Sequence, residues 1–499
     1  MAELTIVIDE LMQSSGVGFG TSGARGKVED MTDKVCYVYT LAFIQHLTQI
    51  KELSVGSNIA IAGDYRPSTK RIMNAVAAAI SDAGFKVINC GTIASPTVAA
   101  FGIANHIPSI MVTGSHIPDD RNGIKFNKAD GEILKEDETG IRNQQVTLTD
   151  KLFDNAGHFI TAHEAPQTDP RAYESYLRRY LDFFPTNCLN GMNIGLYEHS
   201  TVLREAMYDI LIGLGAKVTK LGFSNIFIPV DTEAVREEDI RLARQWSKEH
   251  QLDALVSADG DGDRPLISDE HGEWMRGDIV GILAADYLHA DIIATPVSCN
   301  SAVEKSQHFT QVLRTRIGSP YVIAAMQSAM AKSSDQTIVG YEANGGFLTQ
   351  TVINTDGRQL SPLPTRDAIL PIIAILAASR AQECAISSLQ AELPARYTYS
   401  DRLKEFPTEI SQAKLAPFTI RDQQQALEQV NIFLGDGFTP AVGIDNTDGV
   451  RIILENDEVI HIRPSGNAPE LRCYTESDSM ASAQNLNKVA MERIKSWRE

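Results

Sequence analysis

The stretch Asp82-Ala-Gly-Phe-Lys-Val-Ile-Asn-Cys-Gly91 decides the fold of this 499-residue chain, because it sets the end of a helix directly before a strand. A helical spacing of apolar residues runs from about residue 68 and ends at Gly84, a residue type that favours helix C-termini. The run that begins at Lys86 predicts a strand, and Asn58-Ile-Ala-Ile-Ala-Gly63 predicts another before the helix. This strand–helix–strand order predicts a layered α/β unit with a largely parallel core.

The same pattern recurs in Gly213-Leu-Gly-Ala-Lys-Val-Thr-Lys-Leu-Gly222, which predicts that the α/β unit is duplicated. A weaker third copy begins near Asp291. The final part of the chain alternates apolar and polar residues, in Gly449-Val-Arg-Ile-Ile-Leu and Val459-Ile-His-Ile-Arg, as expected for hairpins of a smaller α+β domain. The positions shared by the first two copies are Gly84, Lys86, Val87 and Gly91, which recur as Gly215, Lys217, Val218 and Gly222.

The length of the chain predicts three or four domains. Changes in composition near residues 161–168, 277–291 and 381–388 indicate the boundaries. We therefore predict an α/β protein with three related mixed-sheet α/β domains, at residues 1–163, 164–283 and 284–386. Residues 387–499 are predicted to form the smaller fourth domain.

Composition disfavours several classes of function. The formal net charge of −19 argues against a nucleic-acid partner, which requires clustered basic residues. The first residues, with Glu3, Asp9 and Glu10, do not resemble a secretory signal, and the most apolar stretch, residues 368–379, is too short to span a bilayer. The six cysteines form no CxxC pair, so free thiols in a reducing cytoplasm are expected.

A predicted strand ends in the polar loop Thr113-Gly-Ser-His-Ile-Pro-Asp-Asp-Arg-Asn-Gly-Ile-Lys125. Ligands bind at the carboxyl ends of strands in open α/β sheets, so the Ser115 hydroxyl is a candidate nucleophile. His116 and Lys125 supply positive or proton-donating groups close to it. The alternative is an ordinary turn with a capping serine, which the set spacing of the other polar residues disfavours.

A second polar loop, Asp259-Gly-Asp-Gly-Asp-Arg264, follows an apolar run and predicts a divalent metal site. Three carboxylates on one tight loop converge on a hard cation, which relieves their repulsion. An EF-hand is rejected because Arg264 stands at the sixth position, where that motif requires glycine, although Glu270 falls at the twelfth. A solvated turn without a ligand is the remaining alternative.

Two further loops carry groups that suit a sugar phosphate. Tyr341-Glu-Ala-Asn-Gly-Gly346 offers Glu342 and Asn344 to hydroxyl groups, although a plain turn is the default interpretation. Arg463-Pro-Ser-Gly-Asn467 combines a guanidinium, a hydroxyl and backbone N–H groups, which together bind phosphate. The sequence Gly18-Phe-Gly-Thr-Ser-Gly23 matches a dinucleotide fingerprint but lacks its context, and is interpreted as a phosphate-facing turn next to Arg25.

With these loops in family order after Gly20-Thr-Ser-Gly-Ala-Arg-Gly26, the chain resembles the α-D-phosphohexomutase superfamily, which includes phosphomannomutases and phosphoglucomutases. It is most like the bacterial phosphomannomutases. The resemblance covers nearly the whole chain, and the serine and metal loops are specific in combination. It implies four domains around a central cleft.

The resemblance also implies the roles of individual residues. Ser115 would carry a phosphate, and a phosphoserine oxygen would bind Mg²⁺ together with Asp259, Asp261 and Asp263. Lys125 would flank the reacting phosphoryl group. The other implied site residues are Arg25 and His116 in catalysis, and Arg264, Glu342, Asn344, Arg463, Ser465, Gly466 and Asn467 in substrate binding.

The sequence departs from the family at two positions. Members often carry histidine where Gly346 stands here, and some carry it where Ser319 stands. Lys125 or Arg25 must therefore take a larger part in acid–base chemistry. Proton transfer by Lys125 would require neighbouring cations to lower its pKa.

The expected activity is the interconversion of hexose 6-phosphate and hexose 1-phosphate, with mannose as the hexose, through a hexose 1,6-bisphosphate. Phosphoglucomutase and phosphoglucosamine mutase activities are the alternatives within the family. A metal-dependent sugar phosphatase and a non-catalytic sugar-phosphate binding protein are the alternatives outside it. We expect a cytoplasmic monomer or homodimer with small-molecule partners and without nucleic-acid or membrane partners.

Overall fold

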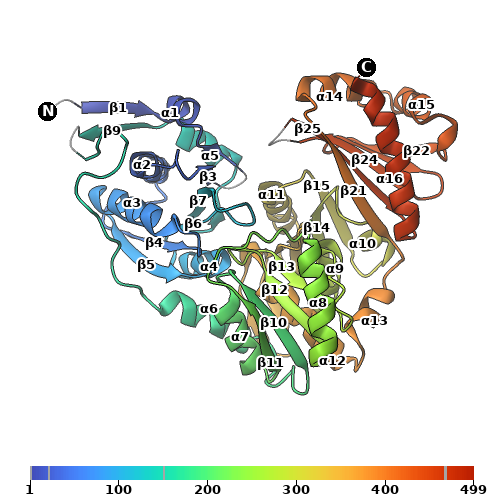
Figure 1. Ribbon diagram of the computed structural model, residues 1–499, viewed down its shortest axis with the longest axis horizontal. Helices are drawn as coiled ribbons and strands as arrows, with labels where there is room; N and C mark the ends of the chain where they lie inside the picture. Colours follow the sequence, from blue (N-terminus) through green and yellow to red (C-terminus); the bar gives the residue numbers. More distant parts are fainter. Residues whose placement is uncertain (1–2, 21–22, 150–151, 466–468, 499) are drawn as a thin grey trace.

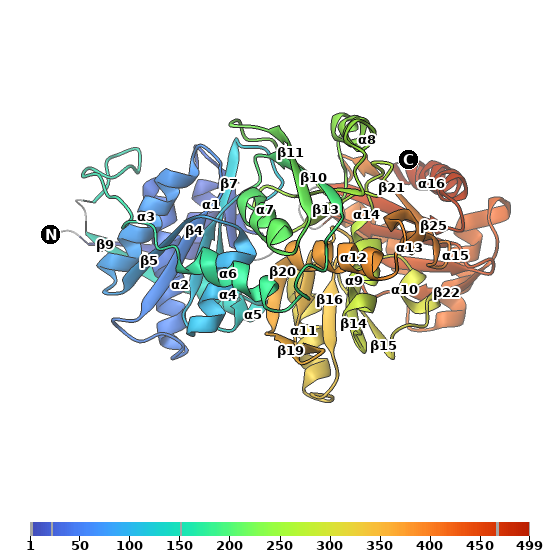
Figure 2. The same cartoon turned by 90° about the horizontal axis from the view of Figure 1, so that it is seen from below.

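Three mixed sheets follow one another along the chain, and an antiparallel sheet comes last (Figure 1). The computed structural model describes residues 3–20, 23–149, 152–465 and 469–498. The first unit (blue) and the fourth unit (red) lie at opposite ends of the molecule, with the second and third units between them, as Figure 2 also shows.

In the first sheet, β4 lies between two parallel neighbours, β5 and β6, and β7 returns antiparallel to β6. β3 and β2 extend the sheet beyond β7, and the short β8 pairs with β7. The strands in sheet order are β2 (Gly18–Phe19), β3 (Gly23–Lys27), β7 (Arg121–Lys128), β6 (Ser109–Val112), β4 (Asn58–Gly63) and β5 (Lys86–Thr92), with β8 (Gly131–Glu132) off this path. The helices are α1 (Ile8–Ser15), α2 (Asp33–Gln49), α3 (Thr69–Asp82), α4 (Ser95–Asn105) and α5 (Lys135–Arg142).

The second and third sheets repeat this order of three parallel strands followed by an antiparallel one. The second sheet is β11 (Lys217–Phe223), β10 (Asn193–His199), β12 (Ala254–Ala258) and β13 (Pro265–Ile267). The third is β15 (Gln311–Thr315), β14 (Ile292–Pro296), β16 (Ile338–Tyr341), β17 (Phe347–Thr349) and β20 (Leu363–Asp367). Their helices are α6 (Arg171–Leu181), α7 (Arg204–Gly213), α8 (Glu237–His250), α9 (Gly277–Tyr287), α10 (Ala302–Lys305), α11 (Ser319–Met330), α12 (Ile369–Ala381) and α13 (Ile386–Ala391).

The internal repeat seen in the sequence has a conformational cause. Gly84 follows α3 with φ of +84°, and Gly215 follows α7 with φ of +94°. These left-handed conformations are open to glycine at little cost, and they turn the chain from a helix into the edge strand of its sheet. The predicted duplication is therefore present, and the third sheet is its third copy.

The fourth unit is a five-stranded antiparallel sheet with helices, as the alternating sequence predicts. Its strands in sheet order are β21 (Tyr397–Lys404), β25 (Glu470–Ser477), β24 (Val459–Pro464), β23 (Val450–Leu454) and β22 (Ala441–Asp445). Its helices are α14 (Thr408–Leu415), α15 (Gln423–Leu434) and α16 (Met480–Lys495). Two small pairs complete the described strands: β1 (Glu3–Val7) with β9 (Gln145–Thr149), and β18 (Ile353–Thr355) with β19 (Arg358–Leu360).

The second and third units share one hydrophobic core, which includes Ile194 of β10, Ile293 of β14 and Ile373 of α12. The apolar helix α12 is buried over almost its whole length, which explains its unbroken apolar sequence. A buried polar contact reinforces the junction, because the Tyr176 hydroxyl of α6 donates to Asp367 at the end of β20 over 2.7 Å. No helix in the described part of the chain is long and apolar enough to cross a membrane.

The fourth unit contacts the third through hydrogen bonds from backbone N–H groups of the third unit to two carboxylates of the fourth. The Arg396 guanidinium is 2.6 Å from Glu476, which also accepts from the backbone N–H of Ser301 over 3.1 Å. Asp448 accepts from the backbone N–H of Ile317 over 3.0 Å.

The predicted mixed α/β fold class is confirmed, and all six cysteines are free. The domain boundaries at residues 163, 283 and 386 remain predictions.

Candidate active site

Three of the four predicted loops occupy the same place in their sheets. Each connects the third parallel strand of a unit to the antiparallel strand beside it. The serine loop lies between β6 and β7, the metal loop between β12 and β13, and the sugar loop between β16 and β17. All three therefore leave their sheets at the carboxyl end of a buried parallel strand, where ligands bind in such folds.

Ser115 is held in a conformation that non-glycine residues rarely adopt, with φ of +55°. Its backbone N–H donates to the Thr113 hydroxyl over 2.8 Å, and that hydroxyl donates to the buried Asp64 over 2.7 Å. The Ser115 hydroxyl itself donates to Asp259 of the metal loop over 2.7 Å. Backbone conformations of this kind cluster at functional sites, so the geometry supports a reactive serine.

Arg66, which was not predicted as a site residue, holds the serine loop in place. Its guanidinium pairs with Asp64 and donates to the backbone carbonyls of Ser115 and Ile117 over 2.8 Å and 2.6 Å. The same guanidinium fills the space beside Gly114, where a Cβ atom would lie 2.6 Å from Arg66 Cζ. The sequence contains a signal for this contact, because Asp64-Tyr-Arg66 directly follows the strand β4.

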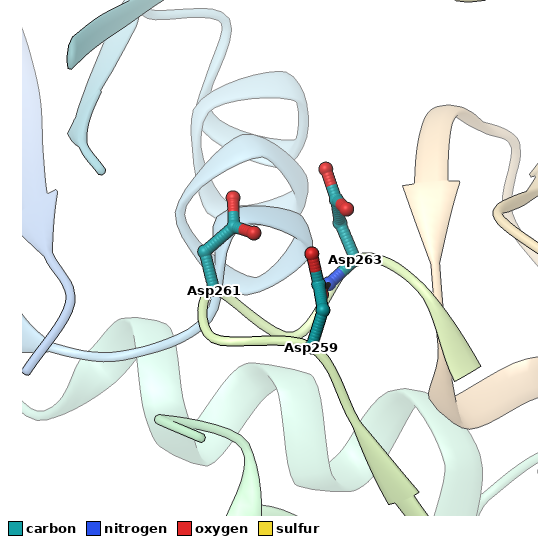
Figure 3. Close-up of side chains that lie close together, drawn as sticks. All are labelled: Asp259, Asp261 and Asp263. Carbon is teal, nitrogen blue, oxygen red and sulfur yellow. Dashed lines mark hydrogen bonds between the residues drawn. The ribbon is translucent and has the colours of Figure 1, made fainter. Parts of the chain in front are cut away.

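The metal loop gathers its three aspartates on one side, as Figure 3 shows. Carboxylate oxygens of Asp259, Asp261 and Asp263 lie within 4.8 Å of one another, and all three residues are buried. The turn is fixed by the backbone N–H groups of Asp263 and Arg264, which donate to Asp259 over 3.1 Å and 3.2 Å.

The first unit also contacts the metal loop. Ser95, the first residue of α4, donates its hydroxyl to Asp261 over 2.6 Å and its backbone N–H to the Asp261 carbonyl over 2.9 Å. The positive end of the α4 helix dipole thus faces this carboxylate. Ser95 was not predicted as a site residue, because nothing in its local sequence links it to a loop so distant along the chain.

These carboxylates fit a divalent cation. Asp261 Oδ1 and Asp263 Oδ1 are buried and have no hydrogen-bond partner in the described structure. Burial raises the pKa of Asp259 well above its usual range, and the charges of Asp261 and Asp263 raise it further. Oxygen ligands that repel one another suit a hard cation such as Mg²⁺.

The EF-hand alternative is excluded by the structure around the loop. Strands β12 and β13 flank it where an EF-hand has helices. Glu270, at the twelfth position, lies elsewhere and accepts a hydrogen bond from the Ser387 hydroxyl.

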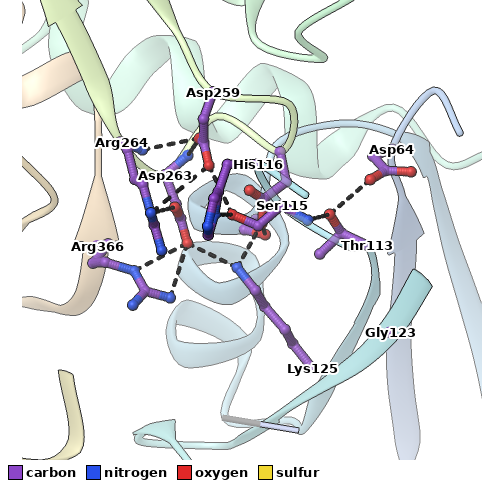
Figure 4. Close-up of polar contacts among 12 residues, drawn as sticks. Asp64, Thr113, Ser115, His116, Gly123, Lys125, Asp259, Asp263, Arg264 and Arg366 are labelled. Carbon is purple, nitrogen blue, oxygen red and sulfur yellow. Dashed lines mark hydrogen bonds and ion pairs between the residues drawn. The ribbon is translucent and has the colours of Figure 1, made fainter. Parts of the chain in front are cut away.

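Cations from two other units balance the metal loop, as Figure 4 shows. Lys125 Nζ, on β7, lies 2.5 Å from Asp261 and 2.8 Å from Asp263. Arg366, on β20, approaches Asp263 from the third unit to within 3.1 Å. Burial alone would lower the pKa of Lys125, but Asp261 and Asp263 outweigh it and raise that pKa. Lys125 is therefore charged in this arrangement, and its part in proton transfer stays a prediction.

His116 and Arg25 complete the surroundings of Ser115. His116 Nδ1 lies 3.3 Å from the Ser115 hydroxyl. Burial lowers the pKa of His116 to about 2, with a further contribution from the cations Arg264 and Arg25, so its imidazole is neutral at physiological pH. Of the two roles expected for His116, a positive group or a proton donor, the second stays a prediction. Burial and Arg264 also lower the pKa of Arg25 to about 10, which leaves it charged.

In the sugar loop, Glu342 and Asn344 are buried. Glu342 Oε2 accepts from Arg366 Nη1 over 3.3 Å. The side-chain oxygen of Asn344 accepts from the backbone N–H of Gly346 over 2.9 Å, which stabilises the turn. The Thr232 hydroxyl donates to the Asn344 carbonyl over 2.8 Å, so a segment of the second unit also holds this loop.

Arg366 contacts both positions where histidine was expected. Its Nη1 lies 3.4 Å from the Ser319 hydroxyl, and its aliphatic carbons lie against Gly346. Arg366 was not predicted as a site residue. Its position at the end of a strand, just before the apolar helix α12, was the available signal.

Arg463 lies at the end of β24, and its Nε is 3.4 Å from Asp448. Ser465 is buried, and its backbone N–H donates to the Glu470 carbonyl over 2.8 Å. Gly466 and Asn467 lie outside the described residues. The glycine-rich segment near the N-terminus leads into β3, which pairs antiparallel with β2, and not into the helix of a dinucleotide site.

Comparison with known proteins places this geometry in a family. Residues 16–151 match phosphoglucomutase/phosphomannomutase alpha/beta/alpha domain I, residues 276–397 match domain III, and residues 415–493 match the C-terminal domain. A phosphomannomutase of Salmonella muenchen is 44% identical over 98% of this chain and 97% of that protein. A phosphomannomutase of Sinorhizobium fredii is 39% identical over 94% of this chain and 97% of that protein.

A phosphoglucomutase/phosphomannomutase family protein from Burkholderia thailandensis has the same fold. Its crystal structure superimposes with a TM-score of 0.70 at 17% identity, and covers 96% of this chain and 97% of that one. With the serine, metal and sugar loops at equivalent positions of three repeated sheets, and with relatives that match nearly end to end, this chain belongs to the phosphoglucomutase/phosphomannomutase family.

Proposed function

We propose that this protein is a phosphomannomutase, which interconverts mannose 6-phosphate and mannose 1-phosphate. The observation that carries the proposal is the contact between the Ser115 hydroxyl and Asp259, at 2.7 Å, inside a cluster of buried carboxylates and cations. That cluster suits phosphoryl transfer, in which the protein mainly positions groups and stabilises charge. The choice of mannose follows the relatives that are 44% and 39% identical.

In the proposed reaction, Ser115 begins as a phosphoserine. A free hydroxyl of the bound hexose phosphate attacks the phosphorus atom, and the bond between phosphorus and Ser115 Oγ breaks. The proton of that hydroxyl passes in net terms to Ser115 Oγ, which leaves as a hydroxyl group. The product of this half is a hexose 1,6-bisphosphate. After the bisphosphate turns round, Ser115 Oγ attacks the other phosphate and the bond between that phosphorus and the sugar oxygen breaks. The serine proton passes in net terms to the sugar oxygen, so both phosphoryl groups and protons balance over the cycle.

Charge at the reacting group is balanced by side chains of the site. Asp259, Asp261 and Asp263 would hold Mg²⁺, which supplies a Lewis acid for the phosphoryl oxygens when it is bound. Lys125, Arg25 and Arg264 provide fixed positive charges next to Ser115. In a site shielded from water, such preorganised charges stabilise a transition state more strongly than they would in solvent.

Substrate recognition is assigned to the two remaining loops. Glu342 and Asn344 bind hydroxyl groups of the sugar, and Arg463, Ser465, Gly466 and Asn467 grip the phosphate that is not reacting. Because the bisphosphate turns round, this phosphate loop accepts either end of the molecule. We also propose a cytoplasmic monomer or homodimer without a nucleic-acid partner, in keeping with a net charge of −19 and six free cysteines.

A substrate panel tests the function. Wild-type protein with Mg²⁺ and a catalytic amount of the matching hexose 1,6-bisphosphate is expected to interconvert mannose phosphates with a higher kcat/KM than glucose or glucosamine phosphates. Chelation of Mg²⁺ should abolish turnover. Preference for another hexose would favour the phosphoglucomutase or phosphoglucosamine mutase alternative. Stoichiometric release of inorganic phosphate would identify a phosphatase, and binding without turnover would identify a binding protein.

Replacement of the nucleophile should stop the reaction. Ser115→Ala is expected to lower kcat more than about a thousandfold, because it removes the hydroxyl group that carries the phosphoryl group in the proposed reaction. Intact-mass and peptide analysis after incubation with the bisphosphate should find one phosphate on Ser115 in the wild type and none in the variant. Ser54→Ala, at an exposed position, is the matched control. Substantial activity in Ser115→Ala would refute the assignment.

Arg463→Ala tests the phosphate loop. Loss of one charge-assisted contact costs about 1.5–3 kcal/mol, so KM for the hexose phosphate should rise by roughly one to two orders of magnitude. Phosphorylation of Ser115 by the bisphosphate should continue at a reduced rate. Arg402→Ala, an exposed change on β21 of the same sheet, should leave KM unchanged. If KM for Arg463→Ala equals the wild-type value while the fold is intact, the loop is a structural turn.

A further inference from the structure

Arg366 joins the two loops that the proposed reaction must coordinate. Its Nε and Nη2 both lie 3.1 Å from Asp263 of the metal loop, and its Nη1 lies 3.3 Å from Glu342 of the sugar loop. The guanidinium is planar and rigid, so these contacts fix the two carboxylates relative to each other. A lysine in this place would offer one ammonium group and not a fork.

The surroundings of Arg366 hold it in place. The Ser319 hydroxyl, which lies 3.4 Å from Nη1, donates to Glu132 of β8 over 2.9 Å. The hydroxyl of the preceding residue, Thr365, donates to the other oxygen of Glu132 over 2.6 Å. A carboxylate of the first unit thus anchors the strand end that carries Arg366, and burial leaves the arginine little freedom to move.

Arg366 occupies the space that a side chain at position 346 would need. A Cβ atom at Gly346 would lie 2.5 Å from Arg366 Cδ and 2.6 Å from its Cγ, well inside van der Waals contact. A side chain at position 346 and the present position of Arg366 therefore exclude each other. This explains why glycine ends the sugar loop, although φ of Gly346 itself lies outside the left-handed region.

The orientation of Asp263 follows from the same contact. Its Oδ2 is shared between Arg366 and Lys125, whereas its Oδ1 is buried and has no hydrogen-bond partner in the described structure. The arginine thus occupies one oxygen of the carboxylate and leaves the other for a cation. Arg366 likewise occupies one oxygen of the Glu342 carboxylate, because its Nη1 donates to Glu342 Oε2.

We propose that Arg366 is a positioning residue that couples sugar binding to the metal loop. It sets the direction of the Glu342 carboxylate toward the sugar hydroxyls and of the Asp263 carboxylate toward the cation. The inference rests on the proposed function, because it assumes that Glu342 binds the sugar. Neither contact depends on titration of the arginine, which stays charged at all relevant pH values.

Arg366→Met, Glu342→Gln and the double variant test this coupling. Arg366→Met is expected to raise KM for the hexose phosphate at least tenfold and to lower kcat. The double variant should be no more than about twofold worse in KM than the worse single variant, because residues that act as a unit are not additive. Arg366→Lys should recover little, since one ammonium cannot span both carboxylates. Arg380→Met, an exposed change on α12, is the control.

Gly346→Ala gives an independent test that keeps the charge. In the wild-type background the added methyl group displaces Arg366, so KM should rise several-fold. In the Arg366→Met background, where the less bulky methionine side chain can give way, the same substitution should have little further effect. A rise of equal size in both backgrounds would show that Gly346 acts without Arg366 and would overturn the proposal.

The remaining outcomes separate this proposal from the function on which it rests. Three outcomes would reduce Arg366 to a structural role while the function stands. They are additive effects of Arg366→Met and Glu342→Gln on KM, a wild-type KM in Arg366→Lys, and a loss of Vmax and melting temperature with unchanged KM in Arg366→Met. Titration calorimetry with mannose 1-phosphate, in a Ser115→Ala background, measures the same coupling without turnover. If that protein does not bind the sugar phosphate and the wild type converts no hexose phosphate, both proposals fail.

Discussion

The carboxylates of Asp259, Asp261 and Asp263 lie within 4.8 Å of one another in a buried loop, and the rest of the site depends on how their charge is balanced. Three like charges in a medium of low dielectric repel strongly, and each loses its hydration when it is buried. The loop itself contributes one cation, Arg264, whose Nε lies 3.9 Å from the Asp259 carboxylate and 3.7 Å from the Asp263 carboxylate. The balance therefore requires side chains from other units. Lys125 comes from the first unit and Arg366 from the third, so the need for neutrality brings three units together at one point.

The repeated topology explains why this meeting point exists. Each of the three mixed sheets sends out its functional loop between the third parallel strand and the antiparallel strand beside it. One architectural position thus carries the proposed nucleophile, the proposed metal site and the proposed sugar site. The shared core of the second and third units fixes two of these loops relative to each other. The fourth unit contacts the third through Glu476 and Asp448, and these contacts connect the unit that carries the phosphate loop to the third unit.

Features that are encoded within one segment could be predicted from the sequence. The strand and helix around Gly84, the serine loop and the spacing of the three aspartates are local patterns, and the structure contains each of them. Features that depend on contacts across units could not be predicted. Ser95 and Arg366 reach the metal loop through contacts between units. Arg66 reaches the serine loop through packing within the first unit. The local signal at Arg66 and Arg366 is a place at the end of a strand, which is too general to identify a site residue. The neutral state of His116 has the same origin, because it results from burial and from two arginines that lie near it in space.

The central claim, that buried negative charge assembles the site, is tested most directly by the thermal stability of Lys125→Met with and without Mg²⁺. Removal of one partner from a buried ion pair costs about 3–5 kcal/mol, so the variant should melt well below the wild type in the presence of a chelator. Saturating Mg²⁺ should recover most of that loss, because a divalent cation replaces the missing positive charge and stabilises the folded state by binding to it. A variant that melts with the wild type in chelator, or a loss that Mg²⁺ leaves unchanged, would contradict the account.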